Sequence, residues 1–87
     1  MKDINVVEIE KAIEWIHANA EMRKTINKRY SSYGLKHIAE KWAKQYISND
    51  SLIEAMCQCG YNIQRCHPTS PNYWFNIKTL KEKNDGV

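Results

Sequence analysis

Three cysteines and one histidine in the second half of the chain have side chains that could hold a metal ion. They are Cys57, Cys59, Cys66 and His67. Zinc sites usually leave two or more residues between paired ligands, so that both side chains reach one ion. One residue separates Cys57 from Cys59, which on a helix sets the thiols about 200° apart. Cys66 and His67 are adjacent and would point to opposite faces of a strand. The spacing argues against a metal site, and we expect Cys59 and Cys57 to be small buried residues.

The histidines are the remaining candidates for catalytic chemistry. They are His17, His37 and His67, and none lies in a recognisable catalytic motif. The sequence contains no phosphate-binding glycine loop, no HExxH and no GxSxG pattern. A domain of 87 residues also has little room for a substrate pocket. We therefore expect no enzymatic activity, no catalytic residue and no cofactor.

The length and composition predict one small domain. Apolar residues make up 43% and charged residues 26% of the 87 residues, which is ordinary for a globular chain. We expect this domain to span residues 1–83, with residues 84–87 as a frayed tail. No apolar run is long enough to cross a bilayer, and no export signal begins the sequence. We expect a cytoplasmic protein without a membrane partner. Three cysteines, an odd number, also argue against a disulfide framework.

Hydrophobic spacing predicts three helices in the first two thirds of the chain. Ile9, Ala12, Ile13, Ile16 and Ala20 recur at helical intervals, which predicts a helix from about residue 6 to about residue 25. Asn5 and Glu8 fit a capping box at its start. Residues 27–32 are interpreted as a polar connection, with Ser32 as the cap of a helix over 33–46. A third helix is predicted over 50–59, followed by Gly60 in a left-handed conformation.

The pattern changes to strict alternation after Gly60. Two alternating runs, 61–66 and 73–78, predict strands joined by the turn-rich loop 67–72, and 79–83 is interpreted as one helical turn. The predicted fold class is therefore α+β, with three helices followed by a C-terminal two-stranded antiparallel hairpin. This is the element order of a small winged-helix domain, although order alone says little about function.

Charge is distributed unevenly along the chain. Residues 22–48 hold seven bases against one acid, whereas residues 1–21 carry an excess of three acids. A basic block of this kind could contact nucleic acid phosphates. The third predicted helix, however, carries Asp50 and Glu54, and no Lys or Arg occurs from Asn49 through Gln64. The second helix of a helix-turn-helix pair enters the major groove, so an acidic helix at this position disfavours a DNA reader.

Aromatic residues provide a second binding feature. Nine aromatics exceed what one small core needs, and Trp15, Tyr30, Tyr33, Tyr73 and Trp74 cannot all be buried. Trp42 and Phe75 are expected in the core. We expect the partner-binding surface to combine bases and aromatics of the second helix and the hairpin: Tyr33, Lys36, His37, Lys41, Lys44, Arg65, Asn72, Tyr73 and Trp74. If the Tyr33-Gly34 segment and the Ser70-Pro71-Asn72 turn meet in the fold, they form the centre of this surface.

Several short strings occur together in residues 26–78: Ser31-Ser32-Tyr33-Gly34-Leu35-Lys36-His37, Tyr46-Ile47-Ser48-Asn49, Gly60-Tyr61, Ser70-Pro71-Asn72 and Phe75-Asn76. In these strings the chain resembles a group of small proteins carried by phages, plasmids and genomic islands. No site residue transfers from that group. The resemblance implies a setting on a mobile element, where small proteins are commonly regulators or stoichiometric inhibitors of host machinery, such as anti-CRISPR proteins.

These features favour non-catalytic binding. The first hypothesis is an anti-CRISPR-like stoichiometric inhibitor that binds a host protein or nucleoprotein complex. The alternative is a winged-helix-like DNA-binding transcriptional regulator that contacts nucleic acid through the basic residues 22–48. A structural subunit of a larger assembly and a homodimer both remain open.

Overall fold

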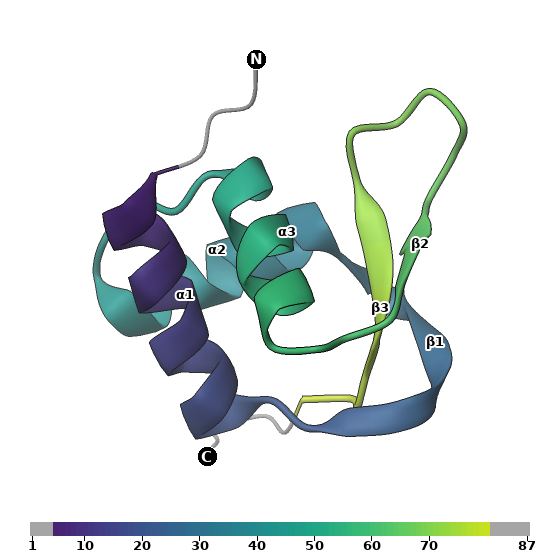
Figure 1. Cartoon of the computed structure of the whole chain (residues 1–87), viewed down its shortest axis with the longest axis horizontal. Helices are drawn as coiled ribbons and strands as arrows, with labels where there is room; N and C mark the ends of the chain where they lie inside the picture. The colour runs from purple at the N-terminus through teal and green to yellow at the C-terminus, as the bar shows by residue number, and fades with distance from the viewer. Residues whose placement is uncertain (1–4, 81–87) are drawn as a thin grey trace.

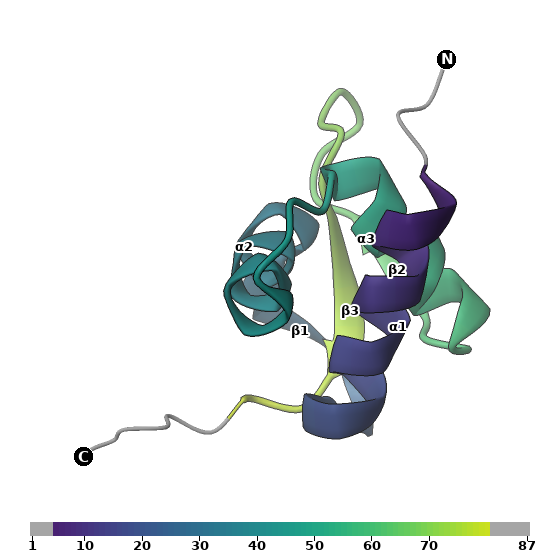
Figure 2. The ribbon, with the colours of Figure 1, turned by 90° about the vertical axis from the view of Figure 1, so that its left-hand side faces the viewer.

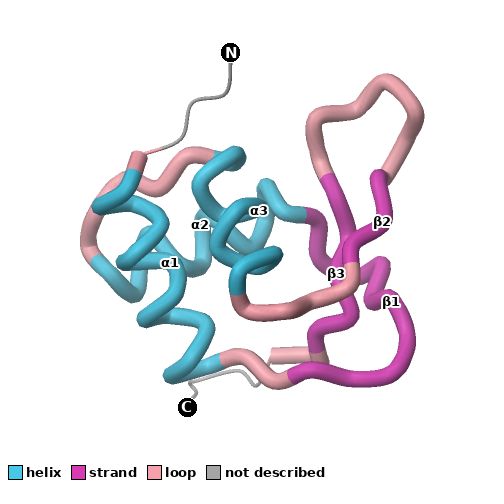
Figure 3. Tube along the Cα trace, viewed as in Figure 1, coloured by secondary structure: helices cyan, strands magenta, loops and turns pink. Residues whose placement is uncertain are grey.

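The computed structural model describes residues 5–80. The elements follow the order α1 (Val6–Asn19), β1 (Met22–Ser31), α2 (Ser32–Ala43), α3 (Asn49–Gln58), β2 (Ile63–Arg65) and β3 (Tyr73–Ile77). Figures 1 and 3 show the three helices gathered on one side and the strands on the other. The α+β class and the three helices agree with the prediction. The predicted element order is wrong, because a third strand, β1, lies between the first two helices.

The start of α1 follows its capping signal, but its end does not follow the predicted boundary. Asn5 Oδ1 accepts hydrogen bonds from the N–H groups of Val7 and Glu8, at 2.9 and 3.2 Å. The helix ends at Asn19, whereas the hydrophobic spacing predicted it to continue to about residue 25. Residues 22–31 form a strand instead, and the five of them that are partly or fully buried (23, 26, 27, 30 and 31) do not alternate with exposed residues. The alternating apolar signal of a strand is therefore missing from this segment.

Two buried asparagines hold β1 in the sheet. The strand order is β1-β3-β2, all antiparallel, with register shifts between Met22 and Ser31. At this irregularity Asn27 Nδ2 donates to the Ile77 carbonyl at 2.9 Å. Asn76 Nδ2 donates to the Arg23 carbonyl at 2.8 Å. Side-chain amides thus replace some of the backbone ladder that a regular strand would use.

The predicted pairing of β2 with β3 is confirmed, but the predicted two-stranded sheet is wrong, because β1 pairs with the other edge of β3. Ile63 pairs with Phe75, and Arg65 pairs with Tyr73. The strands are shorter than the alternating runs suggested. The loop between them projects past the helices, as the two perpendicular views in Figures 1 and 2 show.

Helices α2 and α3 each begin at a serine cap. Ser31 Oγ accepts from the Gly34 N–H, so the cap of α2 is Ser31 and not the predicted Ser32. Helix α2 ends at Ala43, because Lys44 adopts a left-handed conformation with φ 56°, and the predicted extension to Tyr46 is wrong. Ser48 caps α3.

The Glu8 carboxylate links α1 to the start of α3. Glu8 Oε1 accepts from the Ser48 N–H at 3.0 Å and from Ser51 Oγ at 2.9 Å. The Asn5 N–H donates to Ser51 Oγ at 3.1 Å. The described hydrogen bonds of Glu8 therefore stabilise the N-terminus of α3, where negative charge is favourable, and do not close the predicted box on Asn5.

The core lies where the helices meet β3. Its largest fully buried side chains include Trp15, Phe75, Leu35 and Ile77. Burial of Phe75 confirms the prediction. Trp15, which was counted among the aromatics that could not all be buried, is 1% exposed. Trp42 was expected in the core but is 44% exposed on α2. Of the two cysteines expected to be buried, Cys57 is exposed and Cys59 is half-buried against the core.

Gly60 and Gly34 offer a test of the turn after α3. Gly60 has φ +88°, as predicted, and an added Cβ would meet nothing within 4 Å. Gly60→Ala should therefore lower the free energy of unfolding by about 1 kcal/mol through backbone strain alone. The matched control, Gly34→Ala on α2, should raise it by about 0.5 kcal/mol. Urea denaturation of both variants checks this, and equal effects would contradict it.

The remaining expectations concern the ends of the chain. Residues 79–80 are not helical, and the rest of the predicted turn over 79–83, like the predicted tail, lies outside the described residues. None of the helices over residues 5–80 has the length and apolarity needed to cross a membrane.

Candidate partner-binding site

A pocket of about 540 Å³ forms where the start of α2, the connection from α2 to α3 and the β2–β3 loop come together. Its lining residues are Tyr33, Tyr46, Ser48, Asn49, Asp50, Pro71 and Asn72. The expectation that the Tyr33 segment and the Asn72 turn meet in the fold is confirmed. We call this the tyrosine–asparagine pocket.

Hydrogen bonds hold the β2–β3 loop against the helices at this pocket. Asn49 Nδ2 donates to the Pro71 carbonyl at 3.2 Å and to Asn72 Oδ1 at 3.1 Å. The Tyr73 N–H donates to buried Ser32 Oγ at 3.1 Å. These bonds join segments more than twenty residues apart, so the pocket is a product of the tertiary structure.

One polar side-chain atom at the pocket is buried without a hydrogen-bond partner in the part of the chain that the structure describes. Asn49 Oδ1 is buried and accepts no hydrogen bond from the described residues. The opposite amide orientation would aim this oxygen at two acceptors, the Pro71 carbonyl and Asn72 Oδ1, and is therefore disfavoured. An unsatisfied buried acceptor costs about 1–3 kcal/mol. Asn49 Oδ1 is therefore a buried acceptor that no donor of residues 5–80 satisfies.

Two exposed tyrosine rings lie over the ammonium of Lys36. Tyr33 and Tyr46 are 53% and 59% exposed. Lys36 Nζ lies 5.7 Å from the Tyr33 ring centroid and 4.6 Å from that of Tyr46. His37 packs edge-on against Tyr33, with ring centroids 4.5 Å apart. Lys36, predicted as a partner-contacting base, is itself buried, and its ammonium contacts both tyrosine rings.

Glu40 neutralises Lys36 and also holds the α2–α3 connection. Its carboxylate accepts from Lys36 Nζ and from the Ile47 N–H, both at 3.0 Å, and lies 3.1 Å from His37 Nδ1. Burial alone would raise the pKa of the Glu40 carboxyl. The hydrogen bonds from Ile47 and Lys36, the charge of Lys36 and the contact with His37 outweigh burial and lower that pKa.

The other predicted site residues lie elsewhere on the surface. Lys41 and Lys44 are both exposed, and Lys44 lies just past the end of α2 rather than on the helix. Arg65 donates to the Tyr73 hydroxyl at 2.8 Å and to the Pro68 carbonyl at 2.9 Å. Trp74 lies 5.1 Å from Lys28 Nζ of β1. The structure thus divides the predicted residues between the tyrosine–asparagine pocket, the hairpin and the exposed side of α2.

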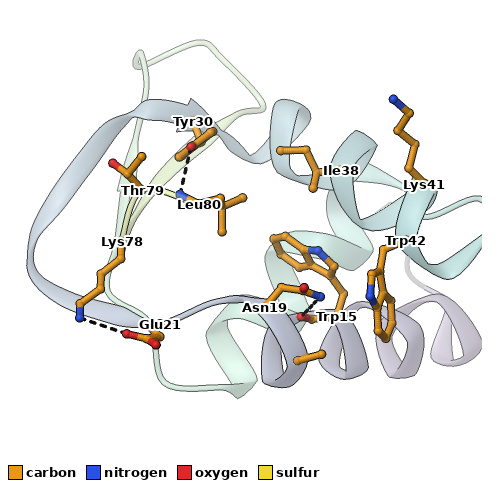
Figure 4. A pocket seen from close by; sticks show the side chains of 11 residues that line it. Trp15, Asn19, Glu21, Tyr30, Ile38, Lys41, Trp42, Lys78, Thr79 and Leu80 are labelled. Atoms are coloured by element: carbon orange, nitrogen blue, oxygen red, sulfur yellow. Dashed lines mark hydrogen bonds and ion pairs between the residues drawn. The ribbon is translucent and has the colours of Figure 1, made fainter. Parts of the chain in front are cut away.

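A second hollow, of about 1030 Å³, lies between α1, α2 and the segment after β3 (Figure 4). Trp15, Trp42 and Ile38 contribute its apolar side chains on the helices. Opposite them, the Leu80 N–H donates to the Tyr30 hydroxyl at 3.1 Å. Lys41 also lines this hollow, which separates it from the residues around Tyr33.

Sequence reasoning missed Tyr46 and Asn49 as site residues. Tyr46 was placed at the end of the second predicted helix, and Asn49 directly before the third, without a role for either in binding. The Tyr46-Ile47-Ser48-Asn49 string in the resemblance was a signal that could have identified them.

Among the described residues, no group of three or more His, Cys, Asp or Glu side chains could hold a metal ion. The three cysteines are free, and Cys59 Sγ lies 3.9 Å from His17 Nε2. Burial raises the pKa of the Cys59 thiol, which disfavours the reactive thiolate.

Comparison with known proteins adds no assignment. No protein-family model, curated protein or solved structure matches this chain.

Proposed function

We propose that the chain is a non-catalytic binding protein of the cytosol that docks through the tyrosine–asparagine pocket on a protein of a host nucleoprotein complex. In this proposal it occupies its target stoichiometrically, as anti-CRISPR proteins do. The observation that carries the proposal is the pocket itself. Two largely exposed tyrosines from one part of the chain meet the Asn72 turn from another. The buried Lys36 ammonium contacts both tyrosine rings, and Asn49 holds the turn. Exposed aromatics around a preformed hollow are typical of protein interfaces.

The charge of α3 supports a protein target over a DNA target. Asp50 and Glu54 are the charged residues of α3, and neither is a base. Asp50 lies in the first turn, the part of a recognition helix that contacts base edges. A carboxylate there meets the negative potential of phosphates, which weakens binding to duplex DNA.

The connectivity favours a second candidate, a winged-helix-like DNA-binding regulator. Helices α2 and α3 are joined by residues 44–48, and β1 pairs with the hairpin that follows α3. Lys24, Lys28 and Arg29 are exposed on β1, and Arg65 is exposed on β2. In this alternative these bases contact phosphates and position the protein, without specifying a sequence.

A capture experiment from host lysate tests the proposal. Tagged wild-type protein should recover a defined protein complex that survives nuclease treatment. The double variant Tyr33→Ala/Asn72→Ala should reduce recovery at least about tenfold, because losing central interface residues costs more than 1 kcal/mol each. Trp42→Ala, which removes an exposed aromatic outside this pocket, is the matched control and should retain the partner. Circular dichroism confirms that each variant is folded.

Two outcomes would contradict the proposal. The first is unchanged recovery with the folded double variant. The second is recovery of partners that disappear with nuclease, together with direct duplex binding that weakens steeply with salt. The second outcome would establish the DNA-binding alternative.

A further inference from the structure

We infer that the second hollow binds a small aromatic anion, that is, an acidic group joined to a body of one or two flat rings. This hollow lies between α1, α2 and the segment after β3 (Figure 4), and it shares no lining residue with the tyrosine–asparagine pocket. Its volume of about 1030 Å³ is in the range of cavities that enclose small-molecule ligands. The inference goes beyond the proposed function and does not rest on it, because it concerns a different surface and a different class of partner.

The α2 wall of the hollow presents apolar surface that is open to solvent. Trp42 and Ile38 line the hollow and are 44% and 37% exposed. The Trp42 indole stacks on no ring and faces no cation among the described residues. Large apolar side chains left open around a hollow are typical of binding sites. The Trp42 indole can therefore receive an aromatic ring without displacing another ring or a cation from its own.

The opposite wall is fixed by hydrogen bonds between distant segments. The Tyr30 hydroxyl accepts from the Leu80 N–H at 3.1 Å. The Lys78 N–H donates to the Glu21 carbonyl at 2.8 Å. These bonds hold the segment after β3 beside β1 and the end of α1, so the hollow is already formed and a ligand does not have to order it. The sequence that continues from Leu80 contains one apolar residue, Val87, and is a poor match for an apolar hollow.

The charge at the hollow favours an anion. Among its lining residues, Glu21 and Lys78 neutralise each other in an ion pair of 3.0 Å. Lys41, on α2, is exposed and forms no ion pair with any described residue. The Tyr30 hydroxyl accepts the bond from Leu80 but donates its proton to no described residue. The hollow therefore has one positive charge in excess and one free O–H donor, which suit a carboxylate or a sulfonate.

The test uses anilinonaphthalene sulfonate, a fluorescent aromatic anion, as the probe and the full-length protein. Titration should raise the probe fluorescence saturably, with a dissociation constant of about 10–100 μM, as expected for a ligand of about twenty non-hydrogen atoms. Naphthoate should displace the probe, whereas naphthylmethylammonium, which carries the same rings and the opposite charge, should bind at least about threefold more weakly than naphthoate. The probe should also raise the urea midpoint of unfolding, because a ligand that binds the folded state stabilises it.

Two pairs of variants separate the charge from the ring. Lys41→Gln should weaken binding of the sulfonate probe about threefold. Its matched control, Lys24→Gln, removes an exposed base of β1 outside the hollow and should leave binding unchanged. Trp42→Leu should weaken binding about fivefold, because a leucine offers no ring to stack on. Its matched control, Tyr46→Leu, removes an exposed ring of the tyrosine–asparagine pocket and should leave binding unchanged. All four side chains are exposed, and circular dichroism confirms that each variant is folded.

Several results would overturn the inference. Equal binding of naphthoate and naphthylmethylammonium would show that charge does not select the ligand. Displacement of the probe by dodecanoate but not by naphthoate would identify a site for acyl chains. A lower urea midpoint would show that the probe binds unfolded protein, and binding that neither Lys41→Gln nor Trp42→Leu weakens would place the probe elsewhere. Capture of a protein through the tyrosine–asparagine pocket is measured separately, so either proposal can fail while the other stands.

Discussion

Trp15→Ala is expected to lower the free energy of unfolding by about 3–5 kcal/mol, the usual cost of truncating a large buried aromatic. Trp15 is 1% exposed and belongs to the single core of the described chain. Small domains are stabilised by only about 5–15 kcal/mol, so this change should remove a large part of the stability of a chain of this length. Urea denaturation followed by far-ultraviolet circular dichroism measures the loss.

Trp42→Ala is the matched control for this prediction. The same atoms are removed, but Trp42 is 44% exposed, and the expected loss is about 1 kcal/mol or less. Hydrophobic spacing alone assigned Trp42 to the core. A larger loss for Trp42→Ala than for Trp15→Ala would show that the structure places the two indoles wrongly.

Glu40→Gln is expected to destabilise the protein by about 2–3 kcal/mol at neutral pH, because it leaves the Lys36 ammonium buried without a counter-charge. The side chains of Lys36 and Glu40 are 8% and 18% exposed. The glutamine amide oxygen can still accept the hydrogen bond from the Ile47 N–H. The measured loss of stability is therefore due mainly to the missing negative charge opposite Lys36. The double variant Lys36→Met/Glu40→Gln should be less destabilised than Glu40→Gln alone, since no unpaired charge remains. Urea denaturation of the wild type, Glu40→Gln and the double variant checks this, and a double variant no more stable than Glu40→Gln would contradict it.

The same carboxyl predicts part of the pH dependence of stability. The pKa of Glu40 is lowered from its ordinary value of 4.5, so the folded state holds its proton less tightly than the unfolded state. The stabilisation is therefore complete above the unfolded-state pKa and is lost as the pH falls through the folded-state pKa. Wild-type stability should decline on acidification below about 4.5 more steeply than that of Glu40→Gln. Parallel declines would show that Glu40 is not a source of this dependence.

Local signals predicted those elements whose cause lies within a few residues. The Asn5 cap, the serine cap of α2 and the left-handed Gly60 each depend on neighbouring backbone groups, and each is found where it was predicted or within one residue. The hairpin was also predicted, because its alternating strands and turn residues are close in sequence.

Strand β1 was not predictable from such signals. Its ten residues are mostly polar, and its partner β3 lies about fifty residues away. The apolar spacing of α1 continued without a clear break, so the helix was extended into the strand. What stabilises β1 is pairing with β3 and the amides of Asn27 and Asn76, which no local pattern encodes.

By itself, the sequence determined the α+β class, three helices and a hairpin, and a basic segment next to an acid-bearing third helix. The tertiary structure decided that Trp15 is buried and Trp42 exposed, and that Lys36 is buried beneath the tyrosines while other bases are exposed. It also decided that Tyr46 and Asn49 lie beside Tyr33 and Asn72 in one pocket. The physical reason is that caps, turns and periodicity act over a few residues. A pocket and a core, in contrast, depend on contacts between distant segments, whose free energy is gained only when the whole chain folds.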